Sequence, residues 1–387
     1  MNHFVTNIHI TKLYHLEGID IPIRDEEYPH LIITGKNGSG KTVLLNTIAD
    51  ALQVVKNQGD PTGTNTGVTL SNLCSGWIQI TNRHGDIICS LDGYPRFEQK
   101  DFIIALYQAD RSVKMIEPDS PQKPQINTNT IRNISSDEFI KFLVDLKFQE
   151  LLSISNNEQE KVDTIKMWFN SFESLLKALF EDDKISLGFE QEQKYTFKIT
   201  KGGQKFGFNE MSDGFKAVLN IVADLILRMQ DGGVLSSAYQ KEGIVLIDEI
   251  ETHLHLELQK MVLPFLTRLF PNIQFIVTTH SPFVLNSIPN AVAYDLEHRE
   301  VLSDLTEYSY ESLAEGYFGV KTPSSYTEMQ LNRLKGLLEK ADWSEADKLE
   351  VKRLTTDFEK IPEAISPLIV GGYRQLAVKY ANRIKEL

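Results

Sequence analysis

The sequence predicts an α/β fold built on a largely parallel sheet with helices on both faces. An apolar segment at 31–34 runs into a glycine-rich loop, after which apolar residues recur at helical spacing. Two more apolar segments, 243–247 and 273–277, are separated by a helical pattern over 254–269. Apolar strands that alternate with helical patterns are typical of a parallel sheet covered on both sides. With 387 residues, 41% of them hydrophobic and 24% charged, the chain has the length of two or three domain-sized units.

The glycine-rich loop has the pattern Gly-x-x-x-x-Gly-Lys-Thr and predicts a nucleoside triphosphate site. Its glycines let backbone N–H groups surround phosphate oxygens without a Cβ in the way, and the following helix adds its positive dipole end. Lys41 is expected to reach the β- and γ-phosphates, and the Thr42 hydroxyl is expected to ligate Mg²⁺. The strand before the loop and the helix after it supply the context that this motif requires. The residues of this loop predicted to hold the nucleotide are Gly35, Lys36, Asn37, Gly38, Ser39, Gly40, Lys41, Thr42 and Val43.

Polar side chains follow two of the other apolar strands. Asp248 and Glu249 come directly after the strand at 243–247. Asp248 fits the second Mg²⁺ contact, and Glu249 is placed to act as the general base that polarises the attacking water. His280 ends the next strand, where its side chain can reach a γ-phosphate or that water. The predicted catalytic residues are Lys41, Glu249 and His280, and the predicted protein ligands of the metal include Thr42 and Asp248.

Two further positions are candidates with ordinary alternatives. Ser212 and Gly214 open a helix predicted over 213–229, and a serine hydroxyl at a helix N-terminus forms an anion site. The alternative for this pair is a plain helix cap. Gln108 directly follows a strand predicted at 102–107, but a polar residue at a strand end needs no special role.

The remaining elements surround these motifs in a definite order. A Pro-, Gln- and Asn-rich stretch from 117 to 133 marks an insertion point, and Ser135–Glu138 has the look of a helix cap. A loop is expected at 59–67. The aromatic residues of the helix after the insertion point are expected to form a core. The remaining strands are expected at 3–24 (two of them), 76–80, 87–91 and 187–208, and the remaining helices at 139–152, 162–179, 311–319, 327–340 and 344–360.

Composition and charge exclude several classes of protein. No apolar run approaches the ~20 residues of a membrane span, and the N-terminus has no basic-plus-apolar export signal, so we expect a cytoplasmic protein without a membrane partner. Cys74 and Cys89 lie in strand-like surroundings, which suits buried thiols better than a disulfide or a structural zinc site. The net charge of −13 argues against a protein whose whole surface attracts nucleic acid, but it does not exclude a local basic groove.

The order of these motifs resembles that of the ABC-type ATPases of the SMC and RecF kind. In that resemblance Gly35–Thr42 is Walker A, Gln108 the Q-loop, Met211–Gly214 the signature, Ile244–Glu249 Walker B and His280 the switch histidine. More narrowly, Ile247–His255 and Thr278–Pro282 are similar to stand-alone ATPases of bacterial anti-phage systems, of the overcoming-lysogenization, PARIS, Septu and retron-associated kinds. The resemblance covers about residues 1–295.

The resemblance implies a P-loop ABC-type head with a mixed or parallel sheet, an antiparallel β subdomain, an inserted helical lobe and a helical C-terminal region. It implies ATP and Mg²⁺ as cofactors, with Gln108 near both. It also implies a homodimer or higher oligomer in which Lys41 acts in cis and Ser212 and Gly214 act in trans. His253 and His255 would contribute to that interface, unless they are surface histidines at a helix start. The implied parts are 1–116 and 187–298 for the two portions of the head, 117–186 for the lobe and 299–387 for the C-terminal region.

The sequence lacks the residue clusters of the nucleases that accompany such ATPases. It has no clustered His/Asn/Cys set of an HNH nuclease, and the tail has no strand-ending Glu with an Asp-x-Asp pair of the Toprim kind. We therefore expect a sensor or scaffold that controls a separate effector nuclease of HNH or Toprim type, triggered by nucleic acid or a phage protein. The alternatives are a RecF-like DNA-repair ATPase that clamps DNA directly and a transporter ATPase.

Overall fold

The computed structural model divides the chain into two compact units, Met1–Tyr308 and Ser309–Leu387. The sequence-based boundaries after residues 116, 186 and 298 all fall within the first unit and stay predictions. The residues that the structure describes are 5–23, 30–56, 68–69, 77–81, 87–93, 102–111, 113–127, 130–191, 194–230, 239–302, 305, 325–340, 342–361 and 367–385. The predicted loop at 59–67, Cys74 and the predicted helix at 311–319 lie outside these ranges.

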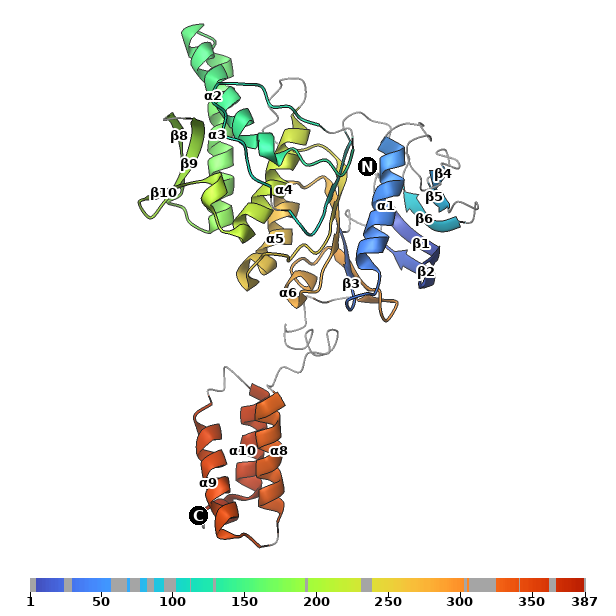
Figure 1. Ribbon diagram of the computed structural model, residues 1–387, viewed down its shortest axis with the longest axis vertical. Coiled ribbons are helices and arrows are strands. Elements are labelled where there is room, and N and C mark those ends of the chain that lie inside the picture. Colours follow the sequence, from blue (N-terminus) through green and yellow to red (C-terminus); the bar gives the residue numbers. More distant parts are fainter. Residues whose placement is uncertain are drawn as a thin grey trace. The chain divides into compact units, whose positions relative to one another are not determined.

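A mixed sheet forms the centre of the first unit (Figure 1). Its strands lie in the order β14-β13-β3-β12-β11-β7, and all neighbours are parallel except β14, which pairs antiparallel with β13. The strands β3, β12, β11 and β7 are buried along their whole length, as their apolar runs predict. The bounds are Glu300–Leu302 (β14), Ala291–Asp295 (β13), His30–Thr34 (β3), Ile273–Thr278 (β12), Gly243–Ile247 (β11) and Ile103–Tyr107 (β7).

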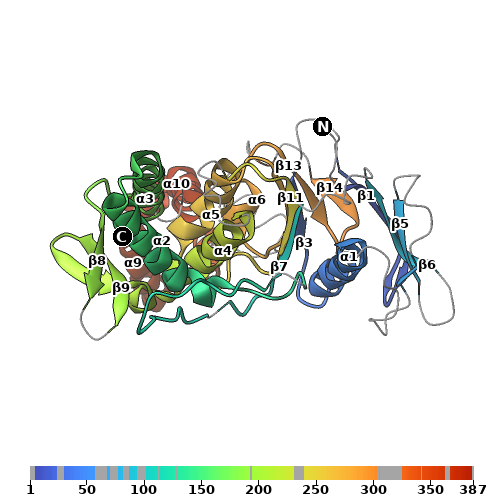
Figure 2. The ribbon, with the colours of Figure 1, turned by 90° about the horizontal axis from the view of Figure 1, so that it is seen from above.

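Helices cover both faces of this sheet, as the sequence predicts (Figure 2). On one face lies α1 (Lys41–Lys56); on the other lie α4 (Asp213–Met229), α5 (Leu256–Leu269) and α6 (Pro282–Leu285). Beyond α1 stands an antiparallel sheet in the order β2-β1-β6-β5-β4. One apolar cluster, which includes Ile8, Leu31 and Leu45, joins β1, β3 and α1. The bounds of the second sheet are Val5–Leu13 (β1), Leu16–Pro22 (β2), Val68–Thr69 (β4), Trp77–Thr81 (β5) and Ile87–Gly93 (β6).

A helical lobe follows β7, as the insertion point at 117–133 predicts. It holds α2 (Phe139–Ser155) and α3 (Gln159–Phe180), and the predicted aromatic core is confirmed because Trp168 and Phe172 are fully buried and stacked at 5.5 Å. An antiparallel sheet in the order β10-β9-β8 packs beside these helices. The strands are Ser186–Gln191 (β8), Tyr195–Lys201 (β9) and Gln204–Gly207 (β10), and a short 3-10 turn, η4 (Phe208–Glu210), leads into α4.

One expectation about local structure is wrong. Ser135–Glu138 is not a side-chain cap: Ser136–Glu138 form a 3-10 turn, η3, and neither Ser135 nor Glu138 caps the helix that follows with its side chain. The Ser135 N–H instead donates to Asp224 Oδ1 of α4 at 2.7 Å, so tertiary contacts set this corner. The described residues beyond Asp295 are mostly helical, as expected, and the three-residue strand β14 extends the central sheet by pairing with β13.

The second unit is a helical bundle with its own apolar core. Its helices are α8 (Ser325–Glu339), α9 (Glu345–Glu359), α10 (Pro367–Lys379) and α11 (Ala381–Lys385). The first two confirm the predicted helices, and Ser344 caps α9 by accepting a hydrogen bond from the Asp347 N–H. Within the described residues of both units, no helix is long and apolar enough to cross a membrane.

Two leucines of α9 test this core against each other. Leu354 is 2% exposed in the bundle core, whereas Leu349 on the same helix is 74% exposed. Leu354→Ala should lower the stability of the bundle by about 2–5 kcal/mol, because the substitution removes buried methyl groups and leaves a cavity. Leu349→Ala should change it by less than about 0.5 kcal/mol. Hydrogen exchange of the α8 and α9 amides in the full chain measures both, and equal protection in the two variants would contradict this packing.

Candidate nucleotide-binding site

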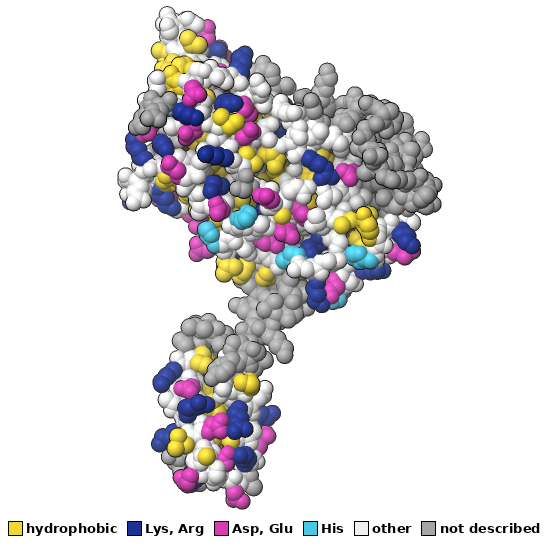
Figure 3. Space-filling model, viewed as in Figure 1, with side chains coloured by type: hydrophobic (Ala, Val, Ile, Leu, Met, Phe, Trp, Pro, Cys, Tyr) yellow, Lys and Arg dark blue, Asp and Glu magenta, His cyan; other side chains and the backbone are white. Residues whose placement is uncertain are grey.

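The parallel strands bring the predicted motifs to one edge of the sheet. Because β3, β12 and β11 are neighbours with the same direction, the residues after their carboxyl ends meet. These are the glycine-rich loop after β3, the Asp248–Glu249 pair after β11 and Thr279–His280 after β12. Figure 3 shows histidine and acidic side chains along the lower edge of the first unit, the edge at which α6 lies in Figure 1.

The glycine-rich loop has the backbone that its glycines permit. Gly38 and Gly40 have φ of +83° and +99°, a region that favours glycine, and a Cβ on Gly35 would lie 2.9 Å from Ser39 Oγ. Lys41 Nζ crosses the loop and donates to the carbonyls of Gly35 at 2.8 Å and Lys36 at 3.0 Å. Burial lowers the pKa of Lys41, and the nearby carboxylates of Glu249, Glu251 and Asp248 oppose that effect. The loop is therefore shaped for phosphate, with its cation held inside.

The residues predicted at the metal come together. Thr42 Oγ1 donates to Asp248 Oδ1 at 3.2 Å, and Thr278 Oγ1 donates to the same oxygen at 2.6 Å. A hydroxyl beside a carboxylate is a donor set that suits Mg²⁺, which takes few protein ligands and completes its shell with phosphates and water. The described residues hold no cluster of three or more His, Cys, Asp or Glu side chains that could bind a metal ion by themselves.

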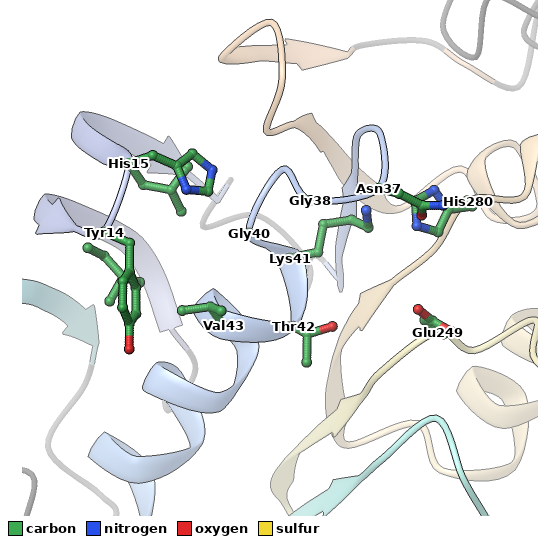
Figure 4. Close-up of a pocket in the computed structure, with 12 residues that line it drawn as sticks. Tyr14, His15, Asn37, Gly38, Gly40, Lys41, Thr42, Val43, Glu249 and His280 are labelled. Atoms are coloured by element: carbon green, nitrogen blue, oxygen red, sulfur yellow. The ribbon is translucent and has the colours of Figure 1, made fainter.

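A cavity of about 350 Å³ lies over the loop, and Figure 4 shows the residues that line it. Glu249 and His280 face it from one side, with Lys41 and Thr42 between them and the β1–β2 turn. Burial lowers the pKa of His280, and the charge of Lys41 lowers it further, so the imidazole is neutral at pH 7. The cavity is lined by Leu13, Tyr14, His15, Leu16, Asn37, Gly38, Gly40, Lys41, Thr42, Val43, Glu249 and His280.

The β1–β2 turn is a part of this cavity that the sequence did not reveal. Tyr14 has φ of +54° and is 80% exposed, and His15 Nε2 lies 3.1 Å from the Ser39 carbonyl oxygen. An aromatic and a histidine in a tight turn give no signal of their own, because only the packing of the second sheet on α1 places them at the loop. Their rings lie on the side of the cavity opposite Glu249 and His280.

Two acidic residues after β11 have different surroundings. Glu249 has φ of +43°, which non-glycine residues seldom adopt, and its side chain reaches the cavity. Both oxygens of Glu251 are engaged, one by Thr279 Oγ1 at 2.7 Å and the other by the His280 N–H at 2.6 Å. Glu251 therefore holds the segment that carries His280, and Glu249 is the carboxylate directed at the cavity.

The signature residues lie apart from this cavity. Ser212 is exposed at the start of α4, and its hydroxyl makes no capping bond to the described backbone of that helix. Gly214 is buried, and a Cβ there would lie 2.9 Å from the His253 carbonyl oxygen, so α4 packs closely on the exposed segment of His253 and His255. Among the described residues that line the cavity, none comes from α4 or from this segment.

Gln108 also lies outside the cavity lining. Its Nε2 donates to Asn46 Oδ1 at 3.2 Å, and Asn46 Nδ2 donates to the Thr42 carbonyl at 2.8 Å. Its link to the loop therefore runs through α1, and its predicted contacts with nucleotide and Mg²⁺ stay predictions. Arg111, three residues further on, is a buried residue that the sequence did not single out. It donates to the carbonyls of Asp248 at 2.7 Å and Glu249 at 3.0 Å.

A strand, a phosphate-shaped loop and a helix, with a carboxylate from a neighbouring parallel strand, define a P-loop nucleotide-binding fold. The comparison with known families agrees: residues 90–286 match the family described as "AAA domain, putative AbiEii toxin, Type IV TA system". The chain belongs to this family.

Similar curated proteins carry related names. The chain is 28% identical over 231 residues to the Septu protein PtuA of Bacillus mycoides (strain KBAB4), covering 57% of this chain and 31% of that protein. It is 29% identical over 160 residues to the Retron Vc95 probable ATPase of Vibrio cholerae serotype O1 biovar El Tor, covering 41% of this chain and 29% of that protein. It is 41% identical over 91 residues to the Retron Ec83 probable ATPase of Escherichia coli, covering 23% of this chain and 17% of that protein. The matches thus span a third or less of each relative.

Solved structures give a looser similarity. The SmcHead bound to the C-winged helix domain of ScpA matches with a TM-score of 0.44 and 13% identity over 79% of this chain and 100% of that one. The SMC head domain from Thermotoga maritima matches with a TM-score of 0.37 and 17% identity over 75% of this chain and 94% of that one.

Proposed function

We propose that the chain binds ATP with Mg²⁺ and hydrolyses it to ADP and phosphate at the cavity over the glycine-rich loop. The observation that carries the proposal is that Lys41, Thr42, Glu249 and His280 line one cavity. Asp248 is joined to this set by the hydrogen bond that it accepts from Thr42. The loop amides and Lys41 bind the phosphates, and Thr42 with Asp248 would hold Mg²⁺. The metal would draw charge from the phosphate oxygens.

The two side chains opposite the loop divide the work of hydrolysis. Glu249 takes a proton from the attacking water through its carboxylate, which reaches the cavity and accepts one hydrogen bond, from Thr252 Oγ1 at 3.2 Å. His280, neutral because burial lowers its pKa, orients that water or the γ-phosphate through a ring nitrogen. Glu251 keeps the His280 backbone in place by accepting its N–H.

Glu249→Gln should retain ATP binding while turnover falls by roughly 10²-fold or more, as for the loss of a positioned base. Steady-state phosphate release and nucleotide titration measure the two effects. Glu257→Gln on the exposed start of α5 is the matched control and should leave both unchanged. Near-normal turnover in Glu249→Gln would refute this assignment.

Each site is completed by a second copy of the chain. The support is that Ser212 is exposed at a helix N-terminus with its hydroxyl turned to no described backbone donor of that helix, while the cavity lining lacks α4. A helix N-terminus with a serine and a close-packed glycine binds anions. The resemblance to ABC-type ATPases implies that this element faces the phosphates held by the partner's loop. Two sites then form at the interface of a homodimer.

Complementation between two inactive variants tests the shared site. Lys41→Ala removes the cation of the loop, and Ser212→Arg fills the opposite side with bulk and charge, so each alone should be nearly inactive. Mixed in equal amounts, the two should recover about one quarter of wild-type turnover, since half of the dimers carry one intact site. Mass measurement confirms subunit exchange.

A covalently linked dimer with a single Ser212→Arg separates the remaining cases. If the site is shared between two chains, the linked dimer should show full turnover at its intact site and the mixture should recover activity. A mixture that stays inactive despite exchange, together with full turnover at the one intact site of the linked dimer, would mean that each site is complete within one chain. Loss of turnover at both sites of the linked dimer would instead mean obligatory coupling between the two sites.

ATP turnover controls a separate effector in phage defence. The support is the similarity to a Septu protein and to retron ATPases, two of the kinds of anti-phage system that the motifs resemble. The effector is a nuclease of HNH or Toprim type, and the chain itself cleaves no nucleic acid.

The purified chain with ATP and Mg²⁺ or Mn²⁺ should therefore leave plasmid, single-stranded DNA and tRNA intact. Gel analysis after prolonged incubation measures this. The Lys41→Ala variant, purified in parallel, reports contaminating nuclease. Cleavage that a substitution in this chain abolishes would overturn the division of labour between ATPase and effector.

A further inference from the structure

Arg111 is a charged residue in a fully buried position. It is 2% exposed, and its guanidinium donates four hydrogen bonds to backbone carbonyls. Burial lowers its pKa to about 10, so it remains protonated at neutral pH. The acceptors are the carbonyl oxygens of Gln108 (3.1 Å), Asp248 (2.7 Å), Glu249 (3.0 Å) and Ile250 (3.2 Å). Burying a charge is unfavourable unless it is well hydrogen-bonded, and here three consecutive carbonyls do this.

Those carbonyls belong to the turn that carries Glu249. The left-handed backbone of Glu249 persists only where its surroundings hold it, because non-glycine residues avoid this region. Thr278 Oγ1 accepts the Glu249 N–H at 2.7 Å on one side, and Arg111 donates to the Glu249 carbonyl on the other. Both peptide groups of Glu249 are thus fixed by side chains from other elements.

We infer that Arg111 is a positioning residue that directs the Glu249 carboxylate at the attacking water by fixing the backbone of 248–250. Arg111 is not among the described residues that line the cavity. Its loss should therefore lower kcat and leave ATP affinity largely intact, since the phosphate-binding groups lie on the loop after β3. The inference rests on the proposed hydrolysis at Glu249.

The helix that begins with the signature, α4, contacts the backbone of Arg111. Asn220, buried in α4, donates through Nδ2 to the Arg111 carbonyl at 2.9 Å and to the Val113 carbonyl at 3.3 Å. A contact chain therefore runs from α4 through Asn220 and Arg111 to Glu249. A shift of α4 at the partner's nucleotide would reach the general base by this route.

Arg111→Met and Arg111→Lys in the full chain test the inference. Arg111→Met should lower kcat on the order of 10²-fold, as for a small misplacement of a catalytic group, with the ATP dissociation constant within about threefold of wild type. The kcat of Arg111→Lys should lie between those of the wild type and Arg111→Met, because an ammonium keeps the charge but cannot span three carbonyls. Arg228→Lys is the control: Arg228 is also buried, pairs with Asp224 at 2.7 Å and lies outside the site. It should lower the melting temperature and leave kcat per folded molecule unchanged.

Hydrogen exchange gives a readout that does not depend on hydrolysis. The amides of 248–251 should exchange faster in Arg111→Lys than in the wild type, and Arg228→Lys should not reproduce this change. Wild-type kcat in folded Arg111 variants, unchanged exchange at 248–251, or ATP binding and kcat falling together with stability would each overturn the inference. A wild-type chain without ATPase activity would refute the proposed function instead, and the exchange comparison would still decide whether Arg111 holds this turn.

Discussion

One carboxylate oxygen joins the strand ends on which the site depends. Asp248 Oδ1 accepts hydrogen bonds from Thr42, at the start of α1, and from Thr278, at the end of β12. Bonds to an ionised acceptor in a buried position are the strong ones, and Asp248 is 4% exposed. The Thr278 hydroxyl also accepts the Glu249 N–H. These hydrogen bonds connect the glycine loop, the Asp248–Glu249 pair and the strand that precedes His280, and together they form one frame.

The parts of this frame that the sequence predicted are those with local signals. The loop at 35–42 and Asp248 are marked by glycines and by apolar runs that end in polar residues, because strand, loop and helix must follow one another within a few residues. The helices predicted at 213–229 and 344–360 agree with α4 and α9 to within one residue at each end. Such patterns depend on backbone conformation and burial, which neighbouring residues determine.

What the sequence did not reveal depends on contacts between distant segments. The Asp110–Arg111 pair has the polarity of a surface loop, and only the folding of β7 beside β11 gives Arg111 its carbonyl acceptors. Tyr14 has no distinguishing pattern until the second sheet packs on α1. The strand β13 contains two alanines and only one β-branched residue, Val292, so its pairing with β3 outweighs a weak local preference.

The pairing of β3 also has a consequence for how the chain is made. Both neighbours of β3, namely β12 and β13, are encoded near the end of the first unit. During synthesis the strand that leads into the glycine loop must wait for about 260 residues, on the order of 10–50 s at typical elongation rates, before both of its edges are paired. Until then a strand with three consecutive apolar residues and two open edges can pair wrongly with other chains. Long-range pairing of this kind also slows folding. A ribosome-bound or truncated chain that ends before β12 lacks His280 and the Thr278 hydroxyl that donates to Asp248, so its nucleotide site is incomplete.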